Sequence, residues 1–479
     1  MNRPFNEAKY KALLEGLEIK EKLFSSTLEN KDLRIDSQFY TKEPIKNPLL
    51  KYDKIGNLLR NAQYGISISM NENGDGYPIY RMNEIHNMLC DINVSKHAII
   101  NKNELNTFCL NDRDVLFNRT NSFEWVGRTG LYRKINNNDF VFASYLVRFI
   151  PNEKVLLPEY LTAFLNTKYG IWDIKRRARQ SINQTNVNPE EIKAIEIPLL
   201  SISFQKLLKN NFYIANENRI KSLDKYIRAE QILLKELELK DFEPSKDPVN
   251  IKSFKESFLS TGRLDAEYYQ KKYENYLNKI INYKSGYQYF NDVCVLKDKN
   301  FKPADEIIYK YIELSNIGKT GDINGCTKEK GKNLPTRARR IVKKNDVIIS
   351  SIEGSLDSCA LITKEYNGAL CSTGFYVINS DKINSETLLI LFKSNLMQNI
   401  LKKGCSGTIL TAINKSELER IPIPLIDFNK QQEIAELVEE SFALKKQSEN
   451  LLEVAKRAVE IAIEESEEKA IEYINSKSE

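Results

Sequence analysis

Small and apolar residues recur at alternating three- and four-residue spacing over the last fifty or so residues of the chain. They are Ile434, Leu437, Ser441, Leu444, Ser448, Leu451, Ala455, Ala458 and Ala462. This spacing predicts a helix from about Asn429 to Ile474, with a seam that packs against another long helix. The helix is entered through Pro422 and Pro424, which cannot continue a helix themselves. A helical tail on a globular domain would show the same spacing.

A second long helix is predicted from Ser203 to Lys240, after Ile197-Pro198-Leu199. The predicted seam of this helix consists of Ile220, Leu223, Ile227, Leu234 and Leu237. Helices of these lengths would measure roughly 55 and 70 Å. If they pair antiparallel, they hold the globules before them a fixed distance apart. Half-sites on DNA lie about one helical turn or multiples of it apart, so a spacer of this scale suits DNA and other scaffolds alike.

Short segments recur in the same order at an offset of 226 to 232 residues. The pairs are Leu33–Tyr40 with Gly262–Tyr269, Asp91–Asn93 with Asp322–Asn324, Asp114–Phe117 with Asp346–Ile349, Thr185 and Asn188 with Thr411 and Asn414, Ile197–Leu199 with Ile423–Leu425, and Gln205 with Gln431. Six matches in one order indicate an internal duplication. Each copy is predicted to be a mixed α/β globule followed by a long helix.

Segments rich in β-branched and aromatic residues are the strand candidates. They are Tyr80–Ile85, Asp114–Asn118, Val141–Phe149, Ile308–Leu314, Asp346–Ser351 and Ala369–Ile378. Helices are predicted at residues 5–24, 158–165 and 385–392, and the polar, proline-containing segment 241–248 is predicted to be a linker.

The predicted fold class is α/β (α+β), with two similar domains, two long antiparallel helices as a coiled-coil spacer, and an internal pseudo-two-fold repeat. The expected boundaries are an N-terminal helical segment at 1–30, a first domain at 31–200, a spacer helix and linker at 201–260, a second domain at 261–427 and a C-terminal spacer helix at 428–479.

Composition favours a cytoplasmic protein without a membrane span. No segment approaches the ~18 consecutive apolar residues that a membrane helix needs, and the first five residues lack the apolar core of a signal peptide. The seven cysteines are scattered, with no Cys-x-x-Cys motif. We therefore expect buried free thiols, not a disulfide or zinc framework.

Charge is distributed unevenly between the terminal helix and the rest of the chain. The net charge is +6, but residues 430–479 hold 13 acidic and 7 basic side chains, so the other 429 residues carry +12. A basic body and an acidic helix suggest that the body meets a polyanion and the helix does not. A solvated surface of mixed charge would give the same numbers.

The segment Asp114–Ser122, followed by Trp125-Val126-Gly127-Arg128, resembles the target-recognition domains of specificity (S) subunits of type I restriction-modification systems. Further pieces agree in the same order: Gln63–Ser67, Pro78–Met82, Ser144–Arg148, Ile182–Asn186, Arg263–Tyr269, Gly407–Ile409 and Ile421–Leu425 with Gln431-Gln432. The resemblance covers essentially the whole chain, including the long helices and the repeat.

The resemblance implies two target-recognition domains, each reading one half of a bipartite sequence in double-stranded DNA, with the helical pair setting the gap. It implies docking of two methyltransferase (M) subunits and, in a full complex, of restriction (R) subunits. The S subunit is non-catalytic in this family and binds no cofactor; its partners would use S-adenosylmethionine, ATP and Mg²⁺.

The chain departs from the family pattern in three places. Asp265–Tyr269 of the second copy has a different counterpart in Asp36–Tyr40, and only Pro198 precedes the first long helix where the family has two prolines. Residues 350–355 and 118–122 also differ between the copies. Different loops at equivalent positions fit two different half-sites.

Candidate DNA contacts lie in polar and basic loops, because Asn and Arg match base edges, and Thr, Ser and Lys reach phosphates. In the first domain they are Tyr64, Gly65, Arg81, Asn118, Arg119, Thr120, Asn121, Ser122, Arg128, Arg176, Arg177, Arg179, Gln184 and Asn186; in the second they are Ser351, Lys402, Lys403, Ser406 and Thr408. The alternatives are a polar turn at 118–122, a solvated basic face at 175–180, a surface charge at Arg128 and a turn at Gly65.

Enzymatic activity has little support in the sequence. The sequence contains neither of the glycine-rich motifs that bind nucleotides, Gly-x-x-x-x-Gly-Lys-Ser/Thr and Gly-x-Gly-x-x-Gly. It also lacks the Asn/Asp-Pro-Pro-Tyr/Phe motif of adenine methyltransferases. Asp346, Glu353 and Lys364 are of the residue types found in a carboxylate–lysine nuclease site, but their spacing is loose. Asp114, the counterpart of Asp346 in the first copy, has no equivalent glutamate and lysine. A DNA-cleaving enzyme, a subunit of a methyltransferase-only or related phage-defence complex, and a coiled-coil scaffold are the alternative functions.

Overall fold

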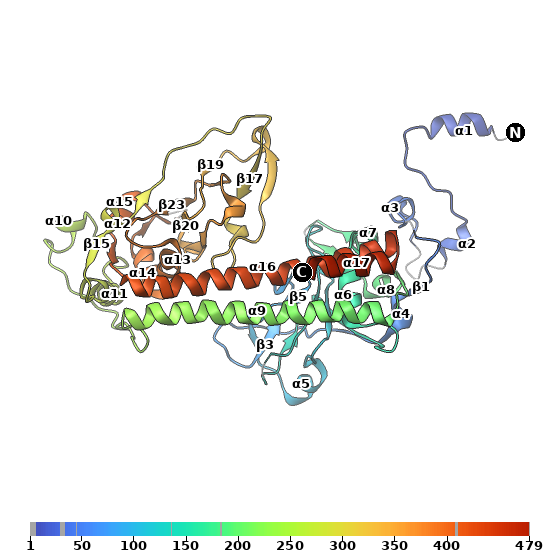
Figure 1. The fold of residues 1–479 in the computed structure, drawn as a ribbon, viewed down its shortest axis with the longest axis horizontal. Helices are drawn as coiled ribbons and strands as arrows, with labels where there is room; N and C mark the ends of the chain where they lie inside the picture. The colour runs from blue at the N-terminus through green and yellow to red at the C-terminus, as the bar shows by residue number, and fades with distance from the viewer. Residues whose placement is uncertain are drawn as a thin grey trace. The chain divides into compact units, whose positions relative to one another are not determined.

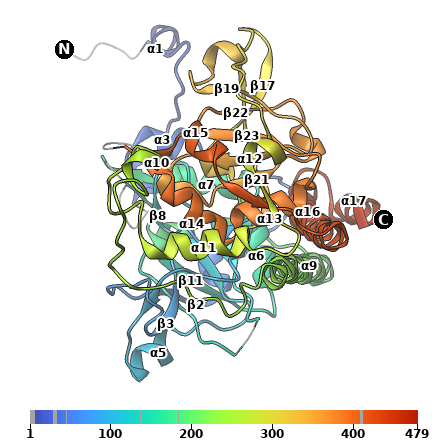
Figure 2. The same ribbon diagram turned by 90° about the vertical axis from the view of Figure 1, so that its left-hand side faces the viewer.

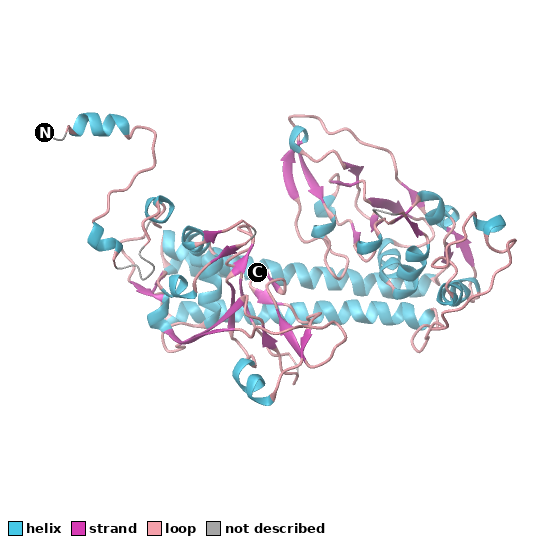
Figure 3. Ribbon diagram, turned by 180° about the vertical axis from the view of Figure 1, so that it is seen from behind, coloured by secondary structure: helices cyan, strands magenta, loops and turns pink. Residues whose placement is uncertain are grey.

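The computed structural model describes residues 6–28, 34–44, 46–135, 137–182, 184–407 and 411–478. The chain folds into two compact units. Unit 1 comprises Met1–Ile220 and Lys446–Glu479, and unit 2 comprises Lys221–Lys445. Each unit combines strands with helices (Figure 3), which confirms the predicted mixed α/β class. Each unit also includes part of both long helices.

Unit 1 is built on a six-stranded sheet in the order β2-β11-β7-β9-β5-β4. These strands are β2 (Leu59–Tyr64), β11 (Leu146–Pro151), β7 (Val115–Asn118), β9 (Thr129–Leu131), β5 (Leu89–Cys90) and β4 (Ile85–His86). Helix α6 (Pro158–Asn166) contacts β7, β9 and β11 and buries nearly all of its residues. Figure 2 shows β2 and β11 beside each other.

Three smaller sheets complete unit 1. They are β10 (Val141–Phe142) with β3 (Tyr77–Tyr80) and β6 (His97–Ala98); β12 (Arg179–Gln180) with β13 (Thr185–Asn186) and β8 (Thr120–Asn121); and β1 (Tyr52–Lys54) with β14 (Glu196–Pro198). The short helices are α1 (Glu7–Leu13), α2 (Phe24–Thr27), α3 (Ser37–Thr41), α4 (Ile55–Leu58), α5 (Lys102–Phe108), α7 (Lys168–Arg177) and α8 (Pro189–Lys193).

Unit 2 has two four-stranded sheets and two strand pairs. The strands of the first sheet are, in order, β16 (Val295–Leu296), β23 (Phe375–Asn379), β20 (Val347–Ser350) and β21 (Cys359–Leu361). Those of the second are β18 (Thr327–Lys330), β17 (Ile308–Ile312), β22 (Leu370–Ser372) and β19 (Ala338–Ile341). The pairs are β15 (Tyr287–Tyr289) with β26 (Pro422–Pro424), and β24 (Cys405–Ser406) with β25 (Ala412–Ile413). Its short helices are α10 (Phe258–Thr261), α11 (Lys271–Ile281), α12 (Phe290–Val293), α13 (Ser385–Lys393), α14 (Asn395–Lys403) and α15 (Lys415–Glu419), with 3-10 turns at Leu314–Asn316, Gly331–Asn333, Glu353–Ser355 and Lys364–Tyr366.

The long helices α9 (Ile202–Glu236) and α16 (Phe428–Glu464) lie side by side within each unit (Figure 1). In unit 1, Ser448 Oγ donates to the Ala215 carbonyl at 2.6 Å, and in unit 2, Ser441 Oγ donates to the Ser222 carbonyl at 2.7 Å. Partner numbers rise in one helix as they fall in the other, so the helices are antiparallel. A serine that reaches the backbone of a neighbouring helix requires small residues at the contact.

The predicted seam of the terminal helix is confirmed. Ile434, Ser441, Ser448, Ala455, Ala458 and Ala462 are buried, and Leu437, Leu444 and Leu451 are half-buried. The predicted seam of α9 is wrong in part, because Ile227 is 39% exposed. The buried positions of α9 are Phe204, Gln205, Leu208, Asn211, Phe212, Ala215, Asn216, Ser222, Tyr226, Ala229 and Leu233. Ala215 and Ser222 contact α16, and Ala229 is buried seven residues further on, a spacing of small residues that a search for large aliphatic residues overlooks.

One glutamine fixes the entry to each long helix. Gln205 Nε2 donates to the Leu200 carbonyl at 2.9 Å, and its Oε1 accepts the Leu157 N–H at 2.8 Å. Gln431 makes the same two contacts in unit 2, with the Ile426 carbonyl at 2.9 Å and the Asn384 N–H at 2.8 Å. Because a buried amide satisfies backbone groups on both sides, the chain direction before each helix is fixed.

Several predicted element boundaries are wrong. The predicted helix 5–24 ends at Leu13, because the chain turns at Gly16 with a positive φ of 79°; residue 5 lies outside the described residues. The terminal helix is interrupted after Glu464, and α17 (Glu467–Ser478) begins beyond it. Helix α9 ends at Glu236, shortly before Glu238 adopts a φ of 54°.

Three predicted strands contain breaks. Residues 81–84 form a turn between β3 and β4, residues 143–145 separate β10 from β11, and residues 373–374 separate β22 from β23. Each run of strand-forming residues serves two strands, and periodicity alone does not locate a turn between them. All seven cysteines are free; five of them are buried as predicted, whereas Cys109 and Cys326 are half-buried. No described helix has both the length and the apolarity of a membrane span.

Replacing Ser448 by leucine tests the close helix contact. The larger side chain would have to displace the backbone of α9, since Ser448 is only 3% exposed. We expect a loss of stability of about 1–3 kcal/mol, measured by thermal unfolding. Asn450→Leu, at an exposed position of the same helix, is the matched control. Equal melting temperatures for the two variants would contradict the close contact.

Candidate nucleic-acid interface

Four neighbouring strands of unit 1 bring polar and aromatic residues together at one end of the six-stranded sheet. Tyr64 ends β2, Arg119 follows β7, Arg128 precedes β9 and Tyr145 precedes β11. Antiparallel pairing aligns these ends, and the Arg119 N–H donates to the Tyr145 carbonyl at 3.0 Å. Together with Trp125 from the adjoining loop, we call these residues the sheet-end surface.

Both arginines of the sheet-end surface stack on exposed aromatic rings. The Arg119 guanidinium lies 5.1 Å from the ring centroid of Tyr64, and that of Arg128 lies 3.6 Å from that of Trp125. Tyr64, Trp125 and Tyr145 are 48%, 43% and 41% exposed. Among the described residues, neither guanidinium forms an ion pair with a carboxylate, and burial lowers the pKa of Arg128. Cationic and aromatic groups thus alternate on one exposed surface, a pattern that favours nucleic acid.

The loop at residues 122–128 is held rigidly from behind. Lys175 Nζ donates to the carbonyls of Phe123, of Glu124 at 3.0 Å and of Val126 at 2.9 Å. Burial lowers the pKa of Lys175 to about 8. Gly127 has a φ of 93°, and a Cβ there would lie 2.6 Å from Ile174 Cγ2. These constraints orient Trp125 and Arg128 before any ligand arrives.

Some predicted contact residues support this surface from within. Asn118 is fully buried, and its Nδ2 donates to the Trp125 carbonyl at 3.4 Å. Thr120 is 3% exposed and donates to Asn186 Oδ1 at 2.5 Å. Asn121 Oδ1 accepts the N–H of Ser122, which is exposed. The prediction that Asn118 and Thr120 face DNA is therefore wrong for the geometry described.

Gly65 has a packing reason within unit 1. A Cβ at this position would lie 2.3 Å from the Ala143 carbonyl oxygen. Only glycine fits so close to this carbonyl. This packing explains the glycine at position 65 without a role in a turn or a close approach to DNA. Arg81 is engaged as well, since its Nη2 lies 2.6 Å from Glu84 Oε1 in an ion pair.

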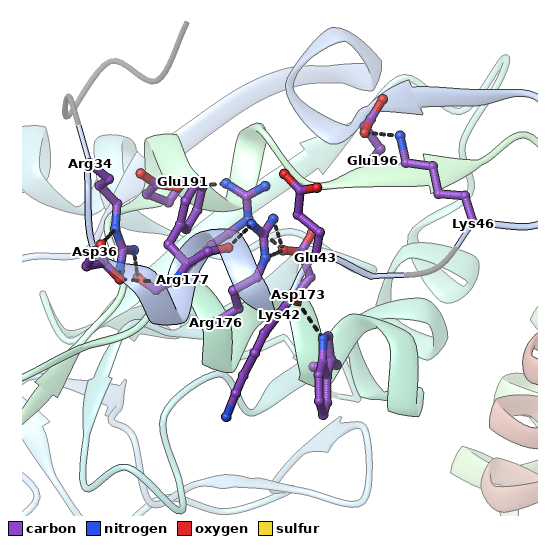
Figure 4. Close-up of polar contacts among 12 residues, drawn as sticks. Arg34, Asp36, Lys42, Glu43, Lys46, Asp173, Arg176, Arg177, Glu191 and Glu196 are labelled. Carbon is purple, nitrogen blue, oxygen red and sulfur yellow. Dashed lines mark hydrogen bonds and ion pairs between the residues drawn. The ribbon is translucent and has the colours of Figure 1, made fainter. Parts of the chain in front are cut away.

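Arg176 and Arg177, predicted as DNA contacts, are buried instead (Figure 4). Both lie within 2.9 Å of Asp173, and Arg177 Nη1 lies 2.6 Å from Glu191. Arg176 Nη1 also donates to the Phe39 carbonyl at 2.6 Å. The run of basic residues at the end of α7 thus serves the interior, because paired carboxylates compensate its burial.

The hairpin after α7 supplies exposed polar groups. Arg179 and Gln184 are exposed on either side of its turn, and Asn186 is half-buried in β13. The Gln184 carbonyl accepts the Ser181 N–H at 2.9 Å, which closes the turn. β13 pairs with β8, so the hairpin adjoins the sheet-end surface.

In unit 2, the predicted residues surround the end of α14. Lys402 lies 3.7 Å from Glu353, and Lys403 Nζ lies 3.5 Å above the ring centroid of Tyr268. Burial lowers the pKa of Lys403 to about 8. Ser406 is exposed on β24, and Thr408 lies outside the described residues. Ser351 Oγ donates to the Gly374 carbonyl at 3.0 Å.

Three backbone hydrogen bonds at the sheet end have direct counterparts in unit 2. The bond from the Arg119 N–H to Tyr145 O (3.0 Å) corresponds to that from the Ser351 N–H to Gly374 O (2.9 Å). The bond from the Asn118 N–H to Arg128 O (2.8 Å) corresponds to that from the Ser350 N–H to Ser358 O (3.1 Å). The bond from the Val187 N–H to Arg119 O (2.9 Å) corresponds to that from the Ile413 N–H to Ser351 O (2.8 Å). The backbone is therefore shared, while Arg119, Arg128 and Tyr145 are replaced by Ser351, Ser358 and Gly374.

Both units also contain an aromatic ring that contacts cationic side chains. In unit 1, Arg34 lies 4.6 Å and Arg176 lies 4.2 Å from the ring centroid of Phe39. In unit 2, Arg263 lies 4.3 Å from the Tyr268 ring that Lys403 also contacts. Each first arginine pairs with the aspartate two residues later, Arg34 with Asp36 and Arg263 with Asp265. The matched segments of the sequence thus mark an aromatic ring enclosed by two cations.

Sequence reasoning did not propose Trp125 and Tyr145 as contacts. Both lie in segments that carry the family resemblance, but their exposure depends on the loop geometry and on a break between two strands. The structure does not support a nuclease site at Asp346, Glu353 and Lys364, because Asp346 is buried and forms an ion pair with Lys297 at 2.5 Å. Within the described parts of the chain, no three His, Cys, Asp or Glu residues cluster in a way that could hold a metal ion.

Residues 285–454 match the family model of the type I restriction modification DNA specificity domain. This match spans most of unit 2 and part of α16. Residues 285–454 are therefore similar to a type I restriction modification DNA specificity domain, in agreement with the family that the sequence resembles.

Three solved structures are similar over most of the chain. A type I restriction-modification S subunit from M. genitalium is 12% identical, with 87% of this chain and 97% of that chain covered and a TM-score of 0.39. The HsdS subunit from Thermoanaerobacter tengcongensis is 11% identical, with 89% and 100% covered and a TM-score of 0.30. A chain from a study of assembly and conformational transition of the type I R-M system is 11% identical, with 88% and 99% covered and a TM-score of 0.28.

The roles of Arg177 and Arg179 can be separated by substitution. Arg177→Gln removes the buried ion pair with Glu191 and one of the two arginines that pair with Asp173, so we expect a loss of stability of about 3–5 kcal/mol. Arg179→Gln, at an exposed position two residues later, should leave the melting temperature unchanged and weaken DNA binding by removing a nearby cation. Thermal unfolding and titration with duplex DNA measure the two effects. Equal melting temperatures would contradict the assignment of Arg177 to the interior.

Burial of Lys403 predicts a pH-dependent stability. Its pKa falls from 10.5 to about 8 on folding, so between these values the unfolded chain binds more protons. The stability cost of the buried charge is therefore greatest below pH 8 and fades as the pH rises through 8. Lys403→Met removes this cost.

The control for Lys403→Met is Lys402→Met, since the Lys402 side chain is 47% exposed. Melting temperatures at pH 7 and pH 9.5 should show Lys403→Met gaining most, relative to Lys402→Met, at pH 7. A difference that is the same at both pH values would show that the Lys403 charge costs nothing.

Proposed function

We propose that this S subunit recognises a bipartite target in double-stranded DNA, one half-site with each unit. The observation that carries this proposal is the repeated backbone at the sheet end with different side chains upon it. A shared scaffold places the two surfaces equivalently, and distinct side chains give each its own base preference. The target-recognition domains would correspond to residues 31–200 and 261–427.

Phosphate contacts by basic side chains supply most of the affinity of such proteins, and contacts to base edges supply the specificity. Arg179 and Gln184 in unit 1, and Lys402 and Ser406 in unit 2, are the exposed predicted residues suited to the first role. Arg119, Asn121, Ser122 and Arg128 of unit 1, and Ser351 of unit 2, are suited to the second.

The partners we propose are two methyltransferase subunits and, in a complete system, restriction subunits. The chain would position these enzymes without catalysing a reaction, in the cytoplasm of a bacterial cell. Cofactors such as S-adenosylmethionine, ATP and Mg²⁺ would be used by the partners. A methyltransferase-only complex would use the chain in the same way.

We further propose that α9 and α16 form a coiled-coil spacer that sets the gap between half-sites. The small residues Ala215, Ser222 and Ala229 of α9, and Ser441 and Ser448 of α16, support this role. They recur every seven residues, so the same contact recurs after each two turns. An added heptad would preserve the contact while lengthening the spacer.

The test is to express the full chain with its methyltransferase partners in a host that lacks this system, and to sequence the methylated DNA. We expect a motif with two specific halves and an unspecified gap. Inserting seven residues after Ser222 and after Ser441 should add roughly 10 Å, or about three base pairs at 3.4 Å each, and leave both halves unchanged.

Inserting seven alanines into the linker after Pro244 is the control, and the gap should then stay the same. A heptad variant that methylates with the original gap would disprove the spacer. Cleavage or methylation by the purified chain alone, with Mg²⁺ and S-adenosylmethionine, would disprove the non-catalytic role.

A further inference from the structure

We propose that Arg128, held over the ring of Trp125, recognises a guanine in the major groove of the half-site bound by unit 1. This inference rests on the proposed function and adds one base identity and two residues to it. Trp125 would act as the positioning platform, and the Arg128 guanidinium as the group that contacts the base.

The first argument is geometric. At 3.6 Å from the ring centroid, the guanidinium lies in stacking contact with the indole. Stacking restricts the rotation of a side chain that otherwise loses much conformational entropy on binding. The planar group then offers its edge, with N–H donors in a fixed fork. Guanine presents two acceptors, O6 and N7, on its major-groove edge, and an arginine fork matches them with two parallel hydrogen bonds.

The second argument is that the donors of Arg128 are not used by the rest of the unit. Arg34, Arg113, Arg148, Arg176 and Arg177 each form an ion pair with a carboxylate. The Arg128 guanidinium makes no hydrogen bond or ion pair with the residues that the structure describes, although burial lowers its pKa. An arginine that loses water without gaining an acceptor is costly to the free protein. An external acceptor repays that cost.

The third argument concerns the support of the platform. Lys175 binds three carbonyls of the loop that carries Trp125, and Gly127 packs closely on Ile174. Recognition of a single base requires such fixed geometry, whereas a phosphate contact tolerates a mobile side chain. Arg119 repeats the arrangement on Tyr64 beside it, with its Nε buried and without a partner in the described structure.

Unit 2 shows that this device is specific to unit 1. The backbone counterpart of Arg128 is Ser358, and that of Arg119 is Ser351. Serine cannot form a planar fork, so the second half-site must be recognised by other groups. The comparison also supplies safe substitutions, because the same backbone carries serine at these positions in unit 2.

The decisive variant is Arg128→Ser, studied as the full chain with its methyltransferase partners. The methylated motif is read by sequencing, as for the unaltered chain. We expect one guanine of one half to become unspecified, while the other half and the gap stay the same. Discrimination at that position should fall by about 5- to 150-fold, the range for a bidentate contact to a base. Trp125→Ala should relax the same position.

Arg60→Ser is the matched control, since Arg60 is an exposed arginine of β2, four residues before Tyr64. Its motif should equal that of the unaltered chain. Circular dichroism and melting temperature verify that each variant is folded. For Arg128→Ser, the salt dependence of binding to the purified complex provides a second measurement.

Three outcomes would overturn the assignment. They are an unchanged motif in Arg128→Ser, a relaxed position that is not guanine, and uniform weakening across all sequences with a salt slope reduced by about one, which marks a phosphate contact. The absence of any methylated motif with the unaltered chain would instead count against the proposed function itself. The two failures are therefore distinguishable.

Discussion

The close approach of α9 and α16 is the constraint on which the two units depend. Ser448 and Ser441 reach backbone carbonyls of the neighbouring helix, and only small residues allow this. The large side chains beside the seam then pack into the core of each unit: Phe204, Leu208 and Leu452 join the core of unit 1, and Tyr226, Leu233 and Val438 join that of unit 2. Each long helix is thereby part of the domain core as well as a connection between domains.

The sheet end combines a conserved backbone plan within the chain with two different sets of side chains. Asn118 and Ser350 are both fully buried at equivalent places, whereas Arg128 and Ser358 differ completely in chemistry. Burial explains this difference between positions. Fully buried polar groups must satisfy their hydrogen bonds inside the fold, while half-buried side chains such as Arg128 and Ser358 can also contact a ligand.

The mixed α/β class and the buried seam of α16 were predictable, because each depends on spacing along the chain. The burial of the basic cluster was not predictable from spacing. Arg176 and Arg177 are buried because they pair with Asp173 and Glu191, and Glu191 belongs to the next helix. Likewise, the small residues of α9 looked unremarkable until Ser441 and Ser448 lay opposite them. Local patterns identify elements, but a partner that is distant in sequence decides which side of an element is used.

Lys175 supports its loop through carbonyl oxygens, which every residue possesses whatever its side chain. The exposed residues 123 and 124 could therefore be exchanged while the hydrogen bonds from Lys175 stay in place. A lineage could alter the displayed chemistry by single substitutions and keep a folded intermediate at each step. In this loop, the capacity to acquire a new DNA target is separated from the risk of misfolding.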